Sequence, residues 1–319
     1  MMYSSSLCRH RAAACGRGTV EIGPGTPARA PFVRIAAILT FLLSVCCGAA
    51  FAEHPSGKDA VLIVAFGTSV EKARISYTNV EERVKKAFPD SVLRWAWSAR
   101  SLLKKGPKDN PALSVQESLA KLAAEGVENV SVLSLHVIPG SEYADLLQNA
   151  RAFEGLPKGL RHVRVAPPLL SDTESLRAVA RLLLETVPAE RGKDEGVLFV
   201  GHGTHHPSGV YYPALQYYLQ AMDGNAFVGT VEGDLDVASV LRSMKGKGLR
   251  KVWMAPLMTV AGDHADNDLF GPEADSWKQR FTADGIQVRS IAKGLGEYPA
   301  FVARWIAGLE KTAGRESSR

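Results

Sequence analysis

Short apolar runs alternate with amphipathic stretches along most of the chain. Several of the runs are apolar almost throughout, which is typical of strands in a parallel sheet that is covered by helices on both faces. The expected strands span residues 60–66, 91–97, 129–136, 162–166, 196–201, 226–231, 251–257 and 286–291. Between them, apolar residues recur at helical spacing over 70–88, 113–125, 172–187, 236–244 and 298–312. This alternation of strands and helices predicts an α/β fold.

The pattern is repeated within the chain. VLIVAFGTS at 61–69 resembles VLFVGHGTH at 197–205, and each is a buried strand followed by a Gly-Thr turn. Further on, VSVLSLHVIPGSEY at 130–143 aligns without a gap with VWMAPLMTVAGDHA at 252–265. We therefore predict two similar doubly wound parallel-sheet α/β domains, which are related by a pseudo-twofold axis and have a cleft between them.

The charged, glycine-containing stretch 189–195 suits a linker between these domains. We place the N-terminal domain at 53–192 and the C-terminal domain at 193–319. Residues 1–52 belong to neither domain.

Residues 1–52 have the pattern of a secretory signal peptide. Five arginines and one glutamate in 1–34 precede the apolar run IAAILTFLLSV at 35–45, and AFA at 50–52 is a small-x-small cleavage signature. The apolar run is shorter than a membrane span requires. We expect cleavage after Ala52, a periplasmic mature chain and no stable membrane insertion; an uncleaved N-terminal anchor is the alternative.

Removal of this leader changes what the composition implies. All four cysteines lie in it, so a metal site in the mature chain has to use His, Asp or Glu. The leader also carries most of the net charge of +5. The near-neutral remainder gives no support for nucleic-acid binding. The sequence contains no GxxxxGK[ST] motif, so we expect no nucleotide cofactor.

Polar residues at the ends of the repeated strands mark a candidate site. In parallel α/β sheets, ligands bind beyond the carboxyl ends of the strands. The repeat places Phe66, His202, Glu142 and His264 at such ends, and three of these are metal-ligand types. Two histidines and a glutamate suit a borderline divalent ion such as Co²⁺, Fe²⁺, Ni²⁺ or Zn²⁺. Three protein ligands leave coordination positions open, as catalytic metal sites do.

Each of these signals also has a purely structural interpretation. A single histidine after a strand is more often a structural residue, and DHADND at 263–268 is typical of a solvated turn or a helix N-cap. The GHG sequence at 201–203 also occurs in tight turns and phosphate-binding nests. His205 and His206 open a helix and are candidates for capping or solvent-facing residues, while His136 suits packing or a cavity wall.

Several longer motifs follow one another along the mature chain. They are VAFGTS, SLHVIPGSEY, GHGT followed by two histidines, and PLMTVAGDHADND with a later DSWK and GLGE. In order and spacing they resemble the anaerobic cobalt chelatases of the CbiK type, from about residue 58 to about residue 309. These sirohydrochlorin cobaltochelatases are related in fold to class II ferrochelatases and insert Co²⁺ into the tetrapyrrole sirohydrochlorin on the anaerobic route to cobalamin. The resemblance implies a metal chelatase with a tetrapyrrole cleft between two α/β domains.

The resemblance also implies roles for individual residues. The metal-binding histidines of the family fall on His202 and His264, and the acidic residue of its GxEY segment falls on Glu142. His202 is the candidate proton acceptor of the reaction, because an imidazole titrates near neutral pH.

The substrate implied by the resemblance carries many carboxylates, so its cleft should present cations and hydrogen-bond donors. Arg100, just after the second expected strand, is one candidate, and the hydroxyls of Thr68 and Ser69 are two more. Arg100 is equally well interpreted as a surface residue of a helix.

Two other functions stay open on the sequence alone. Export is unusual for this family, because most relatives are cytoplasmic. A periplasmic carrier of a tetrapyrrole such as haem, or of a metal ion, is therefore the alternative to an enzyme. A phosphate-handling α/β enzyme would use the Gly-Thr turns, but the sequence lacks a suitable Arg/His constellation for it. A homo-oligomer is expected from the general frequency of symmetric assemblies.

Overall fold

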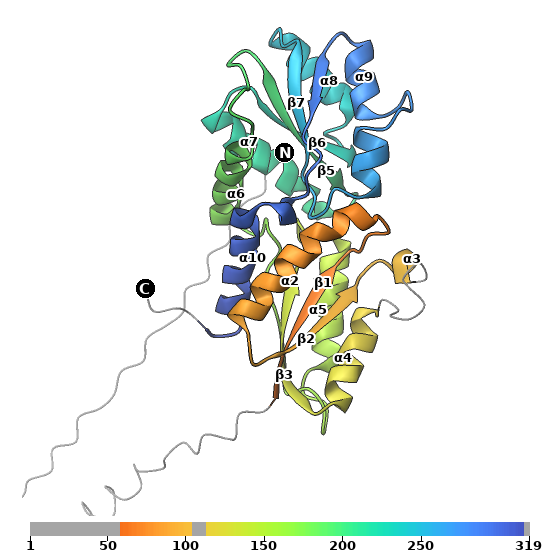
Figure 1. Ribbon diagram of the computed structural model, residues 1–319, viewed down its shortest axis with the longest axis vertical. Coiled ribbons are helices and arrows are strands. Elements are labelled where there is room, and N and C mark those ends of the chain that lie inside the picture. Colours follow the sequence, from red (N-terminus) through yellow and green to blue (C-terminus); the bar gives the residue numbers. More distant parts are fainter. Residues whose placement is uncertain (1–57, 104–112, 316–319) are drawn as a thin grey trace, which may run out of the picture. The chain divides into compact units, whose positions relative to one another are not determined.

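Two parallel β-sheets form the framework of the protein in a computed structural model, which describes residues 58–103 and 113–315 (Figure 1). The first sheet has the strand order β2-β1-β3-β4 and the second β6-β5-β7-β8, and every pairing is parallel. The strands are β1 (Lys58–Ala65), β2 (Val92–Trp97), β3 (Val127–Ser134), β4 (His162–Val165), β5 (Gly196–Gly203), β6 (Ala226–Glu232), β7 (Lys251–Pro256) and β8 (Gln287–Ser290). The equal order of corresponding strands confirms the predicted α/β fold of two similar parallel sheets. The predicted signal peptide at 1–52 lies outside the described residues.

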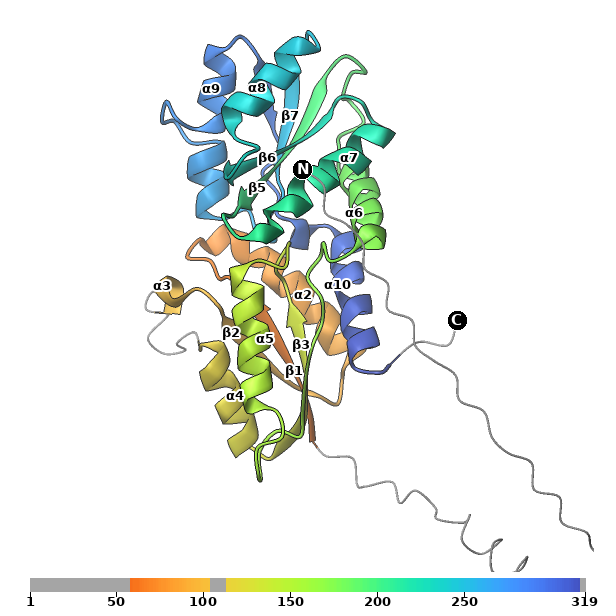
Figure 2. The same ribbon diagram turned by 180° about the vertical axis from the view of Figure 1, so that it is seen from behind.

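Helices cover the faces of both sheets (Figures 1 and 2). They are α2 (Ile75–Ala87), α3 (Arg100–Leu103), α4 (Val115–Ala124), α5 (Ser141–Phe153), α6 (Thr173–Glu185), α7 (Tyr211–Met222), α8 (Val237–Gly246), α9 (Trp277–Ala283) and α10 (Pro299–Thr312). The short turns between them are η1 (Glu71–Arg74), η2 (Pro207–Val210), the π-helical turn η3 (Ala265–Leu269) and η4 (Leu295–Glu297). Within the ranges 58–103 and 113–315, none of the helices has the length and apolar character needed to cross a bilayer.

Side chains at several helix starts explain where these helices begin. Ser114 accepts a hydrogen bond from the backbone N–H of Glu117, whose carboxylate accepts from the N–H of Ser114, so the two form a capping box at the start of α4. Asp172 caps α6 in the same way through Ser175. Such caps satisfy backbone donors that a helix start would otherwise leave without partners.

The central strand of each sheet is buried on both faces. In β1, Val61 and Ile63 belong to one hydrophobic cluster, whereas Leu62 and Val64 belong to another on the opposite face. This alternation follows from the two-residue period of a strand. It explains why the strand sequences are apolar almost throughout.

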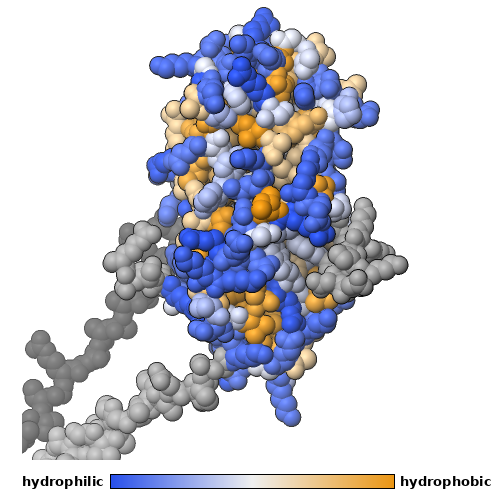
Figure 3. All heavy atoms as spheres, viewed as in Figure 1, coloured by the Kyte–Doolittle hydropathy of each residue, from blue (hydrophilic) through white to orange (hydrophobic). Residues whose placement is uncertain are grey.

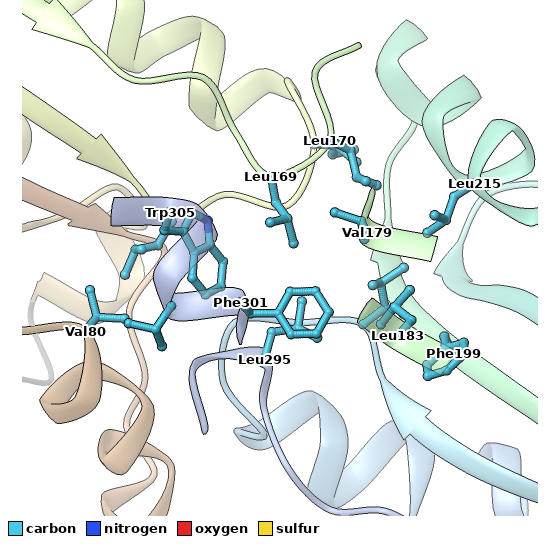
Figure 4. Packing of buried hydrophobic residues seen from close by; sticks show 14 of the residues in the cluster. Val80, Leu169, Leu170, Val179, Leu183, Phe199, Leu215, Leu295, Phe301 and Trp305 are labelled. Carbon is cyan, nitrogen blue, oxygen red and sulfur yellow. The ribbon is translucent and has the colours of Figure 1, made fainter. Parts of the chain in front are cut away.

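One hydrophobic core is shared by the two sheets. It joins Val80 of α2, Leu183 of α6, Phe199 of β5 and Phe301 and Trp305 of α10 (Figure 4). Each sheet also has a smaller cluster on its outer face. That of the first sheet lies under α4 and α5, and that of the second lies under α8 and α9. Because of the shared core, both sheets belong to one compact unit of the chain.

Two helices are exchanged across the predicted boundary at residue 192. The sheets themselves lie on either side of this boundary. However, α6, which precedes it, packs against α7 of the second sheet, and α10, at the end of the chain, packs against α2 and β3 of the first. Figures 1 and 2 both show α10 beside α2. The C-terminal helix therefore ties the first sheet to the second.

We expect Phe301→Ala to destabilise the whole protein in a single step. Phe301 has no exposed surface and lies in the shared core, and truncation of such a side chain costs about 3–5 kcal/mol because a cavity remains. Urea unfolding followed by tryptophan fluorescence measures the loss. Tyr217→Ala, at a position that is 70% exposed, is the control and should change stability little. Two separate transitions in the unmodified protein would contradict the shared core.

Candidate functional site

A cavity of about 640 Å³ opens at the carboxyl ends of strands from both sheets. This is where ligands bind in parallel α/β proteins. Its wall includes Phe66, Thr68, His136, Glu142, His202, Glu232 and His264. The three metal-ligand residues predicted from the sequence therefore line one cavity.

His202 is presented to the cavity by a narrow glycine turn at the end of β5. A side chain on Gly201 would collide with the ring of Tyr212, and a side chain on Gly203 would collide with the backbone carbonyl of Glu232. Gly203 also has a φ of +84°, which favours glycine. Glycine is thus required on both sides of His202, and the GHG sequence fixes the position of the imidazole.

His264 lies directly after Gly262 and Asp263 in the loop that follows β7, and a carboxylate orients it. Its Nδ1 is 2.6 Å from Oδ2 of Asp268. An Nδ1–H that donates to a carboxylate leaves Nε2 free to bind a metal ion. The rings of His202 and His264 are 4.5 Å apart, centroid to centroid, and almost perpendicular, at 86°. The two imidazoles are thus placed as a pair that can bind one ion.

Glu232 is a candidate ligand that the sequence did not reveal. It is the last residue of β6 and lies opposite Gly203 in the parallel pairing with β5. Neighbouring strands β6, β5 and β7 therefore bring Glu232, His202 and His264 to the same edge of the second sheet, and all three line the cavity. Its position at the end of the AFVGTVE run was the available signal. The repeat did not mark it, because residue 232 lies outside the repeated segments 197–205 and 252–265.

Glu142 reaches the cavity from the first half of the molecule. It is the second residue of α5, after the N-cap Gly140, and it lines the same cavity as the histidines. Among the described residues, however, no three His, Cys, Asp or Glu side chains are close enough to hold a metal ion together. The structure thus brings the rings of His202 and His264 together, and among the described residues no third ligand-type side chain joins them closely enough to form a site.

Thr68 and Arg100, two of the predicted substrate-binding residues, differ in what the structure shows of them. Thr68 lines the cavity, and its hydroxyl accepts a hydrogen bond of 3.1 Å from the backbone N–H of Val70. Arg100 begins α3, but its side chain lies outside the described part of the structure.

Ser69 links the two halves of the molecule beside the cavity. Its hydroxyl donates a hydrogen bond of 2.7 Å to Asp263, and Lys72 forms an ion pair of 2.7 Å with Asp266. Both carboxylates belong to the acidic loop that carries His264. This part of the loop therefore contacts the first half and is more than a solvated turn.

His136 lies in the cavity wall as a neutral residue. Its Nδ1 is 2.9 Å from the hydroxyl of Ser134 and its Nε2 is 3.3 Å from that of Ser98. Burial lowers the pKa of His136 to about 4. At neutral pH this imidazole is uncharged, so it contributes hydrogen bonds to the wall but no positive charge.

Of the two histidines at positions 205 and 206, His206 has a structural role. Its side chain caps η2 by accepting a hydrogen bond of 3.2 Å from the N–H of Ser208. His205 is exposed. The structure thus separates His202 from the histidines that follow it.

The charge of the cavity wall favours a cation over an anion. No lysine or arginine occurs among the described residues that line it, whereas Glu142, Glu232 and Asp263 do. Leu135, Val137 and other apolar side chains form much of the remaining wall. The cavity thus combines a metal-binding edge with apolar surface that suits a planar organic ligand.

We expect Asp268→Ala to weaken the binding of a divalent metal ion about 10- to 100-fold, because loss of such an orienting carboxylate has effects of this size. Titration of the metal-free protein with Co²⁺, followed by calorimetry, measures the affinity. Asp266→Ala is the matched control, since the carboxylate of Asp266 belongs to the same loop but pairs with Lys72 and does not line the cavity. Wild-type affinity in the Asp268 variant would show that this carboxylate does not position His264.

Comparison with known proteins points to one family. The family model for cobalt chelatase (CbiK) matches residues 59–314. The sirohydrochlorin cobaltochelatase CbiKC of Nitratidesulfovibrio vulgaris is 34% identical over 258 residues, which cover 80% of this chain and 90% of that protein. The sirohydrochlorin cobaltochelatase of Salmonella typhimurium is 33% identical over 257 residues, or 80% of this chain and 96% of that protein. The solved structure of SirB from Bacillus subtilis with Fe3+ has a TM-score of 0.53 at 15% identity, covers 82% of this chain and 98% of its own, and so shares the fold.

Proposed function

This chain belongs to the cobalt chelatase (CbiK) family, and we propose that it is a sirohydrochlorin cobaltochelatase, which inserts Co²⁺ into sirohydrochlorin. Two relatives of that name are 33–34% identical to it over 80% of its length. The observation that carries the proposal is the His202–His264 pair, 4.5 Å between ring centroids, on the wall of a cavity large enough for an organic ligand. In the reaction, one divalent ion enters the macrocycle and two pyrrole N–H protons leave it.

We propose that His202 and His264 hold the incoming ion and that the carboxylates of Glu142 and Glu232 move towards it when it binds. All four side chains line the cavity. Two carboxylates balance the charge of a divalent cation, and the mixture of nitrogen and oxygen ligands accepts Co²⁺, Fe²⁺, Ni²⁺ or Zn²⁺. Preference for Co²⁺ is therefore inferred from the family and not from the ligands. We also propose that no nucleotide takes part.

His202 is the proposed proton acceptor. An imidazole that binds a metal cannot accept a proton through the same nitrogen, so its two roles have to follow one another. As the pyrrole nitrogens replace the protein ligands around the metal, the imidazole of His202 becomes free to accept a proton. Weak binding of the ion by few protein ligands helps this exchange, because the ion has to leave the protein.

The composition of the cavity wall supports one orientation of the bound substrate. Because the described lining contains carboxylates and apolar side chains but no lysine or arginine, the uncharged ring of the macrocycle suits the interior. The carboxylates of sirohydrochlorin then face the mouth of the cavity. We propose that Thr68, Ser69 and Arg100 contact them there; for Ser69 this requires exchange of its hydrogen bond to Asp263.

We expect the metal-free mature chain to accelerate the insertion of Co²⁺ into sirohydrochlorin, measured by absorbance under anaerobic conditions. His202→Ala and His264→Ala should each slow it at least about 100-fold, because a ligand and, for His202, a proton acceptor are lost. His205→Ala, at an exposed position close to His202 in the sequence, is the control and should keep its rate.

Calorimetric titration with Co²⁺ separates the two carboxylates, and the insertion assay separates the two functions. Glu142→Gln and Glu232→Gln should each lower the affinity for Co²⁺ while keeping the side-chain shape, and a variant with unchanged affinity identifies a carboxylate that is not a ligand. Sirohydrochlorin binding by the wild type without any acceleration would instead support a carrier built on a chelatase scaffold.

We further propose that the protein acts in the periplasm as a homo-oligomer after removal of residues 1–52. Export rests on the charged, apolar and small-x-small pattern of that segment. We expect the protein in the periplasmic fraction of producing cells, with Glu53 as its first residue by N-terminal sequencing. A full-length chain in the cytosolic or membrane fraction would contradict this proposal.

A further inference from the structure

Phe66 is an apolar side chain in an unusual place. The face shown in Figure 3 carries separate hydrophobic patches among hydrophilic residues, and isolated apolar residues on a surface need no explanation. Phe66, however, is 45% exposed and lies in the wall of the cavity. The other large exposed hydrophobic residues of the described ranges lie outside that wall; they are Ile75, Leu156, Val210, Tyr217 and Met222.

The internal repeat pairs Phe66 with His202. Phe66 follows β1 and His202 lies at the end of β5, and these are the corresponding central strands of the two sheets. The next residue is a glycine with positive φ in both turns, at +111° for Gly67 and +84° for Gly203. The two side chains therefore occupy equivalent positions in two turns of the same kind.

A buried tyrosine behind each turn extends this equivalence. The hydroxyl of Tyr212 accepts a hydrogen bond of 3.3 Å from the N–H of Gly203. The buried hydroxyl of Tyr77 lies beside the backbone of Gly67. Since a buried tyrosine stands behind each turn and both tyrosines line the cavity, we infer that Phe66 projects from the first half as His202 does from the second.

The surroundings of the two positions have different chemistry. His202 has His264 beside it and Glu232 on the adjacent strand. The cavity wall of the first half contributes the apolar Val137 and Ile138 instead. The second half thus supplies the paired histidines, whereas the first half supplies, besides Glu142, an aromatic ring and apolar side chains.

We propose that the ring of Phe66 packs against the face of the tetrapyrrole that is turned away from His202 and His264. This inference rests on the proposed chelatase function. A planar macrocycle has two faces, and an aromatic side chain binds such a face through apolar and stacking contacts. With one face against Phe66, the pyrrole nitrogens are open to the metal from the side of the histidines. Phe66 therefore positions the substrate, whereas its counterpart in the repeat binds the ion.

The test compares Phe66→Ala with the wild type in two separate measurements. We expect the KM for sirohydrochlorin to rise about tenfold, since the stacking surface is lost. The affinity for Co²⁺ in the absence of tetrapyrrole should not change, because Phe66 is not a ligand. Phe66→Tyr keeps the ring and should restore the wild-type KM. Tyr217→Ala removes an exposed aromatic ring outside the cavity wall and is the matched control.

The outcomes separate this inference from the function on which it rests. A wild type that inserts no metal overturns the chelatase proposal itself. An active wild type together with an unchanged KM in Phe66→Ala overturns only the stacking role. A variant that loses Co²⁺ affinity in parallel with sirohydrochlorin affinity also overturns it, because Phe66 would then support the metal edge of the cavity.

Discussion

The hydrophobic core shared by the two sheets is the interaction on which the cavity depends. Phe301 and Trp305 of α10 join the first sheet to residues of the second such as Phe199 (Figure 4). The cavity is formed by strand ends from both sheets, so its two walls keep their separation only while this core holds the sheets together. Burial of apolar surface away from the cavity therefore determines whether Phe66 and His202 can act on the same ligand.

Local contacts determine the chemistry of the cavity wall that belongs to the second sheet. Glycine is required on both sides of His202, because a side chain at either position would collide with Tyr212 or with the backbone of Glu232. Asp268 orients His264 at 2.6 Å. Pre-orientation of this kind lowers the cost of binding a metal ion with only a few protein ligands. A chelatase needs such a compromise, because the ion has to be captured and then released to the macrocycle.

The sequence predicted those features that follow from periodicity and repetition. All eight expected strands occur. His202 and His264 meet because the neighbouring strands β5 and β7 end at the same edge of the second sheet. Glu232 was missed as a candidate because it lies outside the two repeated segments that marked the other candidates. The return of α10 to the first sheet was also missed, since an amphipathic pattern shows that a helix is half-buried and not which sheet it covers. The partner of Ser69 could not be foreseen, because Asp263 is 194 positions away.

The central claim is that His202 and His264 of the second half bind the ion, and that Phe66 of the first half packs against the macrocycle. The most direct measurement is anomalous X-ray scattering at the cobalt edge from crystals of the metal-free protein soaked in Co²⁺. The account predicts one strong peak within bonding distance of Nε2 of His264 and an imidazole nitrogen of His202, with a carboxylate of the cavity wall completing the site. A strong peak elsewhere in the protein, with none between these two histidines, would contradict it.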